Sequence, residues 1–139
     1  SSCFITLKTY GVLVFMAEEE LSPQIKDQIN RLQQLRTQLQ MIVQQRQQIE
    51  MRLREVDESI EELEKTDAKA PIYKSVGAIL IKTNGKTEVT KELKSNKETL
   101  ELRKKTLEKQ EGSTKEKLSE LQSKVQNALN IAGGAEEEN

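Results

Sequence analysis

The sequence predicts a mostly α protein, a long antiparallel two-helix coiled coil with a β-hairpin between the helices. Two long segments carry apolar residues at seven-residue spacing, which is the pattern of a coiled-coil seam. The short segment between them, "PIYKSVGAILIKTNG", is rich in Ile and Val, which favour strands. Aromatic residues make up only 3% of the 139 residues, too few for the large rings of a usual globular core. These observations indicate one elongated domain.

The first predicted helix covers about residues 22–66. Ser22 is a good N-cap, and Pro23 suits the first helical position. The seam consists of two sets of residues offset by three positions: Leu32, Leu39, Leu53 and Ile60, and Leu35, Ile42, Ile49, Val56 and Leu63. Arg46 is the polar exception in this seam. Pro71 cannot continue the helix, which therefore ends before it.

The predicted hairpin covers about residues 71–83, with strands Ile72–Ser75 and Ile79–Thr83 and a turn around Gly77. An isolated two-stranded hairpin is marginally stable in water, and its unpaired edges recruit further strands. We therefore interpret the hairpin as an assembly element that pairs with hairpins of other chains, rather than one folded back on its own helices. Its candidate residues are Ile72, Tyr73, Val76, Gly77, Ile79, Leu80 and Ile81.

The second predicted helix covers about residues 87–132. Asn84-Gly85 precedes it and is also a common hairpin turn, but we interpret it as the corner between strand and helix, with Thr87 as the N-cap. Gly133 and Gly134 are expected to end the helix. The two helices have similar lengths, about 65 Å each at 1.5 Å per residue, which favours an antiparallel pairing.

The seam of the second helix is partly charged. One set of positions holds Leu93, Leu100, Leu107, Thr114, Leu121 and Ala128, and the other holds Lys97, Lys104, Glu111, Leu118 and Val125. The charged positions, with Gly112 beside them, predict a coiled coil that bends or frays in the middle. Arg46 is expected to pair with Glu108 or Glu111 across the two helices.

Two terminal segments lie outside the predicted fold. Residues 1–15 are too short to span a bilayer, contain Lys8, and lack the features of a signal peptide. We interpret Met16 as the natural start, so that residues 1–15 are a non-native or disordered extension and residues 16–139 the folded domain. Residues 133–139 are expected to form a solvated acidic tail.

Charge and composition exclude several classes of function. The 22 basic and 23 acidic residues are interspersed, which predicts no surface for nucleic acid or for anionic membranes. One Cys and no His exclude an internal disulfide, familiar zinc sites and His-dependent triads. We therefore expect no enzymatic activity, no metal or other cofactor, and neither nucleic acid nor membrane as a partner.

The hairpin sequence resembles that of a known family. "IYKSVGAILIK", residues 72–82, is similar to the strand motif of the beta-type subunits of prefoldin, an ATP-independent chaperone of archaea and eukaryotes. "LELRKKTLEKQE", residues 100–111, is similar to the start of that family's second helix. The likeness covers residues 16–132, and the eight glutamines between Gln33 and Gln48 resemble archaeal members. A single hairpin between the helices is typical of the beta type.

The resemblance implies the partners and the binding site. It implies a cytoplasmic hexamer of two alpha-type and four beta-type subunits, with strands joined in a central platform from which the coiled coils project. Non-native client proteins would be held at the distal tips and passed to a group II chaperonin. On this chain, the client-binding tip would consist of Ile25, Ile29, Leu32, Leu121, Val125, Leu129 and Ile131.

The seam pattern adds an expectation about exposure at the tip. Ile29 lies one position off the seam and Ile131 lies beyond its last position, so both are expected to be partly exposed. The alternative function is a coiled-coil scaffold or tether without chaperone activity, although a plain tether needs no strand insert. An RNA-binding arm would require basic residues gathered on one face, which the sequence does not show.

Overall fold

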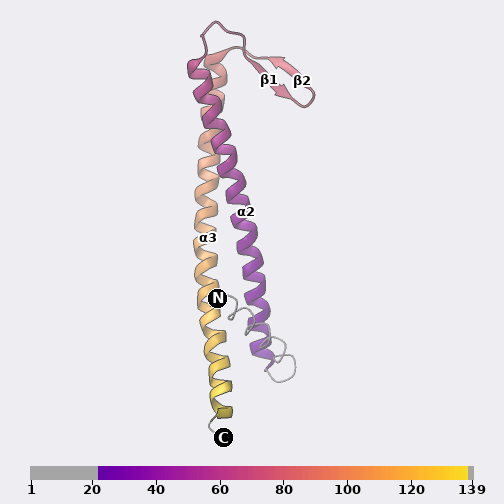
Figure 1. Cartoon of the computed structure of the whole chain (residues 1–139), viewed down its shortest axis with the longest axis vertical. Helices are drawn as coiled ribbons and strands as arrows, with labels where there is room; N and C mark the ends of the chain where they lie inside the picture. Colours follow the sequence, from indigo (N-terminus) through magenta and orange to yellow (C-terminus); the bar gives the residue numbers. More distant parts are fainter. Residues whose placement is uncertain (1–21, 138–139) are drawn as a thin grey trace. The chain divides into compact units, whose positions relative to one another are not determined.

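The computed structural model describes residues 22–137, with side chains as far as residue 131. It contains helix α2 (Pro23–Lys65), strands β1 (Tyr73–Val76) and β2 (Ile79–Lys82), and helix α3 (Lys86–Glu137). The prediction of two long helices with a two-stranded antiparallel hairpin between them is confirmed (Figure 1). The extension expected over residues 1–15 lies outside the described residues.

The chain divides into two compact units. The first, which we call the hairpin unit, is Met41–Gly112 and contains the second half of α2, the hairpin and the first half of α3. The second, the terminal unit, contains the described residues 22–40 and 113–137. Figure 1 shows the β1–β2 hairpin in the hairpin unit, beside the end of α2 and the start of α3.

In the hairpin unit the two helices pack antiparallel along an apolar seam. Ile42, Ile49, Leu53 and Leu107 form a buried cluster, against which Leu100 packs. Cross-helix ion pairs join Arg46 to Glu111 and Asp57 to Lys97, so later positions in α2 meet earlier positions in α3. Each large aliphatic side chain buried in such a seam contributes about 1.5–3 kcal/mol.

The terminal unit has its own small core. Ile29 and Val125 are buried against each other, and Ile25, Leu121 and Leu129 pack around them while remaining partly exposed. Ile25 near the start of α2 and Leu129 near the end of α3 border the same cluster, as the predicted antiparallel pairing requires.

Helix α2 begins and ends within one residue of the predicted bounds. The hydroxyl of Ser22 accepts a hydrogen bond from the backbone N–H of Ile25 at 3.3 Å, which confirms Ser22 as the N-cap. At the other end, the N–H of Thr66 donates to the carbonyl of Leu63 at 3.1 Å and tightens the last turn.

Strand β1 is shifted by one residue from its predicted position, whereas β2 begins at the predicted Ile79 and ends one residue early. Val76 pairs directly with Ile79, so the loop consists of Gly77 and Ala78 alone. Gly77 has a φ of 59°, whereas no residue other than glycine has a positive φ in the described chain. A positive φ at the first loop residue only is the pattern of a type II′ turn, which matches the right-handed twist of paired strands.

Both ends of α3 differ from the prediction. The helix begins at Lys86, and the carbonyl of Gly85 accepts the N–H of Val89 at 3.1 Å, so Thr87 is not the N-cap. It continues through Gly133 and Gly134 to Glu137, so the expected end at residue 132 is wrong. Two glycines cost about 1 kcal/mol each in a helix, which weakens it without ending it.

Candidate functional site

The charged positions of the seam form ion pairs across the hairpin unit. The guanidinium of Arg46 donates from Nε to Glu111 Oε2 at 2.6 Å and from Nη1 to Glu50 Oε1 at 2.9 Å. The expected pair of Arg46 with Glu111 is confirmed, whereas Glu108 lies beside Lys104. The hydrogen bond to Glu111, with a smaller contribution from Glu50, raises the pKa of Arg46.

The ion pair nearer the hairpin joins Lys97 to Asp57. Its Nζ and Oδ1 atoms are 2.7 Å apart, and this hydrogen bond raises the pKa of Lys97. Helix α3 is continuous through Gly112, so the fraying predicted for this part of the seam is wrong, whereas the bend predicted as its alternative stays a prediction. The charged seam is paired because Arg46 on α2 has Glu111 opposite it on α3, and Lys97 on α3 has Asp57 opposite it on α2.

The hairpin exposes most of its apolar side chains. Exposed fractions range from 45% to 71% in five of the seven candidate assembly residues: Tyr73, Val76, Ile79, Leu80 and Ile81. Of the other two, Ile72 is half-buried at the base of the hairpin and Gly77 lies in the turn. All seven therefore lie together in one element, as the sequence predicts.

Apolar side chains lie on both faces of this two-stranded sheet. The register places Tyr73 and Leu80 on one face and Val76, Ile79 and Ile81 on the other. A sheet that is covered on one side only usually alternates apolar with polar residues. This hairpin instead has apolar groups to bury on each side.

Both edges of the hairpin carry outward-pointing peptide groups. The N–H of Thr83 donates to the carbonyl of Ile72 at 2.9 Å, so alternate pairs along the ladder are hydrogen-bonded. The remaining positions, Tyr73, Ser75, Leu80 and Lys82, therefore direct their backbone groups away from the partner strand. Within the described residues the sheet contains only β1 and β2, and these groups are available to further strands.

The seven candidate tip residues occupy three different environments in the terminal unit. Ile29, Leu32 and Val125 are buried, Ile25, Leu121 and Leu129 are half-buried, and Ile131 is 74% exposed. The expected exposure of Ile131 is confirmed. The expected exposure of Ile29 is wrong, because only 7% of it is exposed. The regular seam position beside it holds Gln28, whose amide is costly to bury, and the helix buries the adjacent Ile29 instead.

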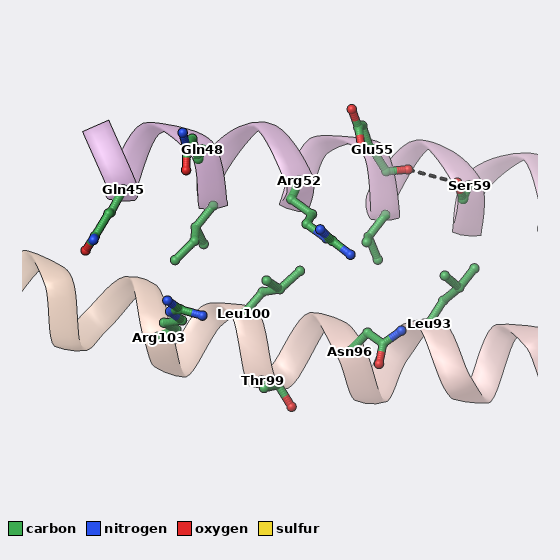
Figure 2. Close-up of a pocket in the computed structure, with 12 residues that line it drawn as sticks. Gln45, Gln48, Arg52, Glu55, Ser59, Leu93, Asn96, Thr99, Leu100 and Arg103 are labelled. Carbon is green, nitrogen blue, oxygen red and sulfur yellow. Dashed lines mark hydrogen bonds between the residues drawn. The ribbon is translucent and has the colours of Figure 1, made fainter. Parts of the chain in front are cut away.

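A groove of about 800 Å³ runs between α2 and α3 in the hairpin unit. Figure 2 shows Leu93 and Leu100 pointing from α3 toward α2, with Arg52 and Arg103 directed into the space from opposite helices. The seven-residue spacing does not predict this groove, because which side of a seam opens depends on how the side chains pack. The one signal in the sequence is that large polar side chains flank the seam here on both helices.

The groove holds no arrangement typical of catalysis. The hydroxyl of Ser59 donates to the backbone carbonyl of Glu55 at 2.9 Å, within its own helix, rather than to a base (Figure 2). In the described part of the chain, no three His, Cys, Asp or Glu side chains come close enough together to hold a metal ion. None of the helices described is long and apolar enough to cross a membrane.

Comparisons with known proteins agree on one family. A family model described as "Prefoldin subunit" matches residues 26–131. A prefoldin subunit beta from Archaeoglobus fulgidus is 46% identical over 115 residues, which cover 83% of this chain and 98% of that protein. Another, from Saccharolobus islandicus, is 42% identical over 111 residues, which cover 80% of this chain and 87% of that protein.

A solved structure extends this similarity to the fold. The crystal structure of the prefoldin beta subunit from Thermococcus strain KS-1 matches with a TM-score of 0.71 at 38% sequence identity. The match covers 80% of this chain and 96% of that one. These relatives are named as prefoldin subunits rather than as enzymes.

Proposed function

Because this chain belongs to the prefoldin subunit family, which gives it a chaperone-type role, we propose that it is a beta-type subunit of an ATP-independent holdase. In this proposal it assembles with alpha-type subunits into a cytoplasmic hexamer of two alpha-type and four beta-type chains. The hexamer holds non-native proteins at the helix ends and delivers them to a group II chaperonin.

The exposed hairpin is the observation that carries the proposal. Five large apolar side chains lie on its two faces, each at least 45% exposed, and both edges have free peptide groups. Each of them is about half exposed, so burying the remainder would contribute about half of the 1.5–3 kcal/mol of a fully buried side chain, and the sum over the five would drive assembly. A plain tether would need no such element, so the hairpin argues against a tether. An oligomeric scaffold would need one as well, and the test of client holding below separates it from the chaperone.

The terminal unit supports the client-binding part of the proposal. Ile131 is exposed, and Ile25, Leu121 and Leu129 are only partly covered, so apolar surface remains at these helix ends. Each such surface is small and would bind a client segment weakly. Several of them in one assembly would bind one client together, and their combined affinity exceeds that of any single site.

Client holding can be tested by light scattering of a denatured client protein that is diluted into ATP-free buffer. We expect this chain, assembled with an alpha-type subunit, to suppress the aggregation at near-equal molar ratios. The substitution Ile131→Ser should reduce the suppression, because it removes exposed apolar surface from the terminal unit. The matched control is Leu102→Ser, which removes a comparable side chain, 68% exposed, from α3 in the hairpin unit.

Comparison of Ile131→Ser with Leu102→Ser shows whether the client binds at the terminal unit. An effect of Ile131→Ser without an effect of Leu102→Ser supports client binding in the terminal unit. Equal effects of the two substitutions would contradict client binding in the terminal unit. No suppression by a correctly assembled wild-type complex would favour the scaffold.

A further inference from the structure

The first turn of α3 contains a lysine that its own helix disfavours. Lys86 is the first residue of this helix, where the macrodipole carries partial positive charge. A cation at this end is unfavourable, typically by a few tenths of a kcal/mol to about 1 kcal/mol. The contacts of the ammonium group explain why a lysine stands there.

Lys86 binds the C-terminal end of α2. Its Nζ donates to the backbone carbonyl of Thr66 at 2.8 Å and to that of Glu64 at 3.2 Å. The last carbonyls of a helix have no partner within it and carry the negative end of its dipole. Lys86 is half-buried, so these charge-assisted hydrogen bonds are partly shielded from water.

The residues just before Lys86 fix the base of the hairpin. The hydroxyl of Thr83 donates to the carbonyl of Ile72 at 2.7 Å and accepts the N–H of Gly85 at 3.3 Å. The end of α2, the base of the hairpin and the start of α3 are thereby connected through a few consecutive residues.

Little else in the described residues holds the hairpin to the helices. Its strand residues are mostly exposed, and only Tyr73, with the half-buried Ile72 at the base of the hairpin, borders a groove together with residues of α2. The ion pair of Lys74 with Glu92, at 3.2 Å, does join β1 to α3, but both side chains are more than half exposed. An exposed pair of this kind contributes little to stability.

We propose that Lys86 is a positioning residue, which sets the direction in which the hairpin leaves the helices by binding the C-terminal carbonyls of α2. This inference rests on the proposed function in one respect, since the direction of the hairpin matters only if hairpins of several subunits have to meet. A hairpin held in one direction loses less conformational entropy on assembly than one that swings freely.

The direction can be measured as a distance between two spin labels in the full chain. One label is attached at Ala78→Cys in the turn and the other at Glu101→Cys on α3, in a chain whose one other cysteine is replaced by Cys3→Ser. The labelled chain is diluted into an excess of unlabelled chain, so that only distances within one molecule contribute. We compare the parent with Lys86→Met, which removes the ammonium group, and with Lys86→Arg, which retains a cationic donor.

We expect a narrow distance distribution in the parent and in Lys86→Arg, and one about twice as wide in Lys86→Met. The matched control is Lys91→Met, an exposed lysine further along α3, which should leave the distribution narrow. Circular dichroism at the helix band should be the same in all four proteins. Assembly of Lys86→Met with an alpha-type subunit should be about tenfold weaker than that of the parent.

Three results would overturn the proposal. The first is an unchanged distribution in Lys86→Met, and the second is an equal broadening in Lys91→Met. The third is a loss of helix signal in Lys86→Met, since Lys86 would then hold the helices together rather than direct the hairpin. The distance measurement requires neither partner nor client, so it stands even if the proposed chaperone function fails.

Discussion

Arg46 occupies a seam position that an apolar residue would ordinarily fill. Its side chain is 22% exposed, and that of Glu111 opposite it is 11% exposed. A partly buried ion pair seldom stabilises a fold more than a well-packed apolar pair does, but the loss of one partner is costly. The pair is therefore better explained as fixing the alignment of the two helices than as adding stability, because only the observed antiparallel alignment brings these two side chains together.

The substitution Arg46→Leu tests this explanation. It removes both hydrogen bonds that the guanidinium gives to Glu111, at 2.6 and 3.4 Å, while the carboxylate stays largely buried. We expect the urea midpoint of unfolding to fall. The double variant with Glu111→Leu should recover at least the parent midpoint, because two leucines fit the seam. A single variant as stable as the parent would show that the pair does not hold the alignment.

The pair of Lys97 with Asp57 predicts a pH dependence at alkaline pH. The pKa of Lys97 is raised in the folded chain above its ordinary value of 10.5, so folding favours the charged form. Its contribution to stability is complete below 10.5 and is lost as the pH rises through the raised pKa. The difference in urea midpoint between the parent and Lys97→Met should therefore be constant near neutrality and vanish in strongly alkaline buffer.

Lys91→Met is the control for this measurement. Lys91 lies exposed on the same helix, so its removal should change the midpoint little at any pH. If the difference between the parent and Lys97→Met persists above the raised pKa, the contribution of Lys97 is one of packing rather than of charge.

The β-hairpin is the element whose formation depends most on a single residue. Gly77 has a φ of 59°, a conformation that costs a residue with a Cβ roughly 1 kcal/mol or more. No atom lies within 4 Å of the position that a Cβ would take there, so the backbone conformation alone determines the cost.

The substitution Gly77→Ala should therefore destabilise the turn by about 1 kcal/mol. Because a two-stranded hairpin is marginal by itself, we expect assembly with an alpha-type subunit to weaken about fivefold. Analytical ultracentrifugation of the mixed subunits measures this change.

Gly112→Ala provides the matched control, since it is the same substitution in a helix. It meets no atom within 4 Å and should stabilise α3 by about 1 kcal/mol without weakening assembly. Equal effects of the two substitutions on assembly would contradict the role assigned to the turn.

The sequence predicts these elements well where one local rule decides them. Ser22 and Pro23 set the start of α2, and the seven-residue spacing identifies the seams. The prediction fails where neighbouring positions compete. Ile29 is buried in place of Gln28. Helix α3 begins at Lys86 because the carbonyl of Gly85 accepts the first helical hydrogen bond and the carbonyl of Thr66, at the end of α2, accepts one from the ammonium group of Lys86. Such competition is settled by contacts between elements, which one sequence does not reveal.

Over the whole chain, each compact unit carries one candidate surface. The hairpin unit has the exposed strands, and the terminal unit has Ile131 with its half-buried neighbours. The strand insert predicts the first surface from the sequence, whereas the second surface is what the resemblance to prefoldin implies. The seam pattern adds only the exposure of Ile131. The groove beside Arg52 and Arg103 was not predicted, because it arises from the packing of side chains rather than from their spacing. Since the two surfaces belong to separate units, the proposed roles in assembly and in client binding can be tested by separate substitutions.

Native mass spectrometry of this chain mixed with an alpha-type subunit tests the central claim, that the exposed hairpin builds a hetero-oligomer. The account predicts a complex of two alpha-type and four beta-type chains. It also predicts that Ile79→Ser with Leu80→Ser, one substitution on each face of the hairpin, abolishes the complex while Leu102→Ser preserves it. Subunits that remain separate, or a complex that survives the double substitution, would contradict the account.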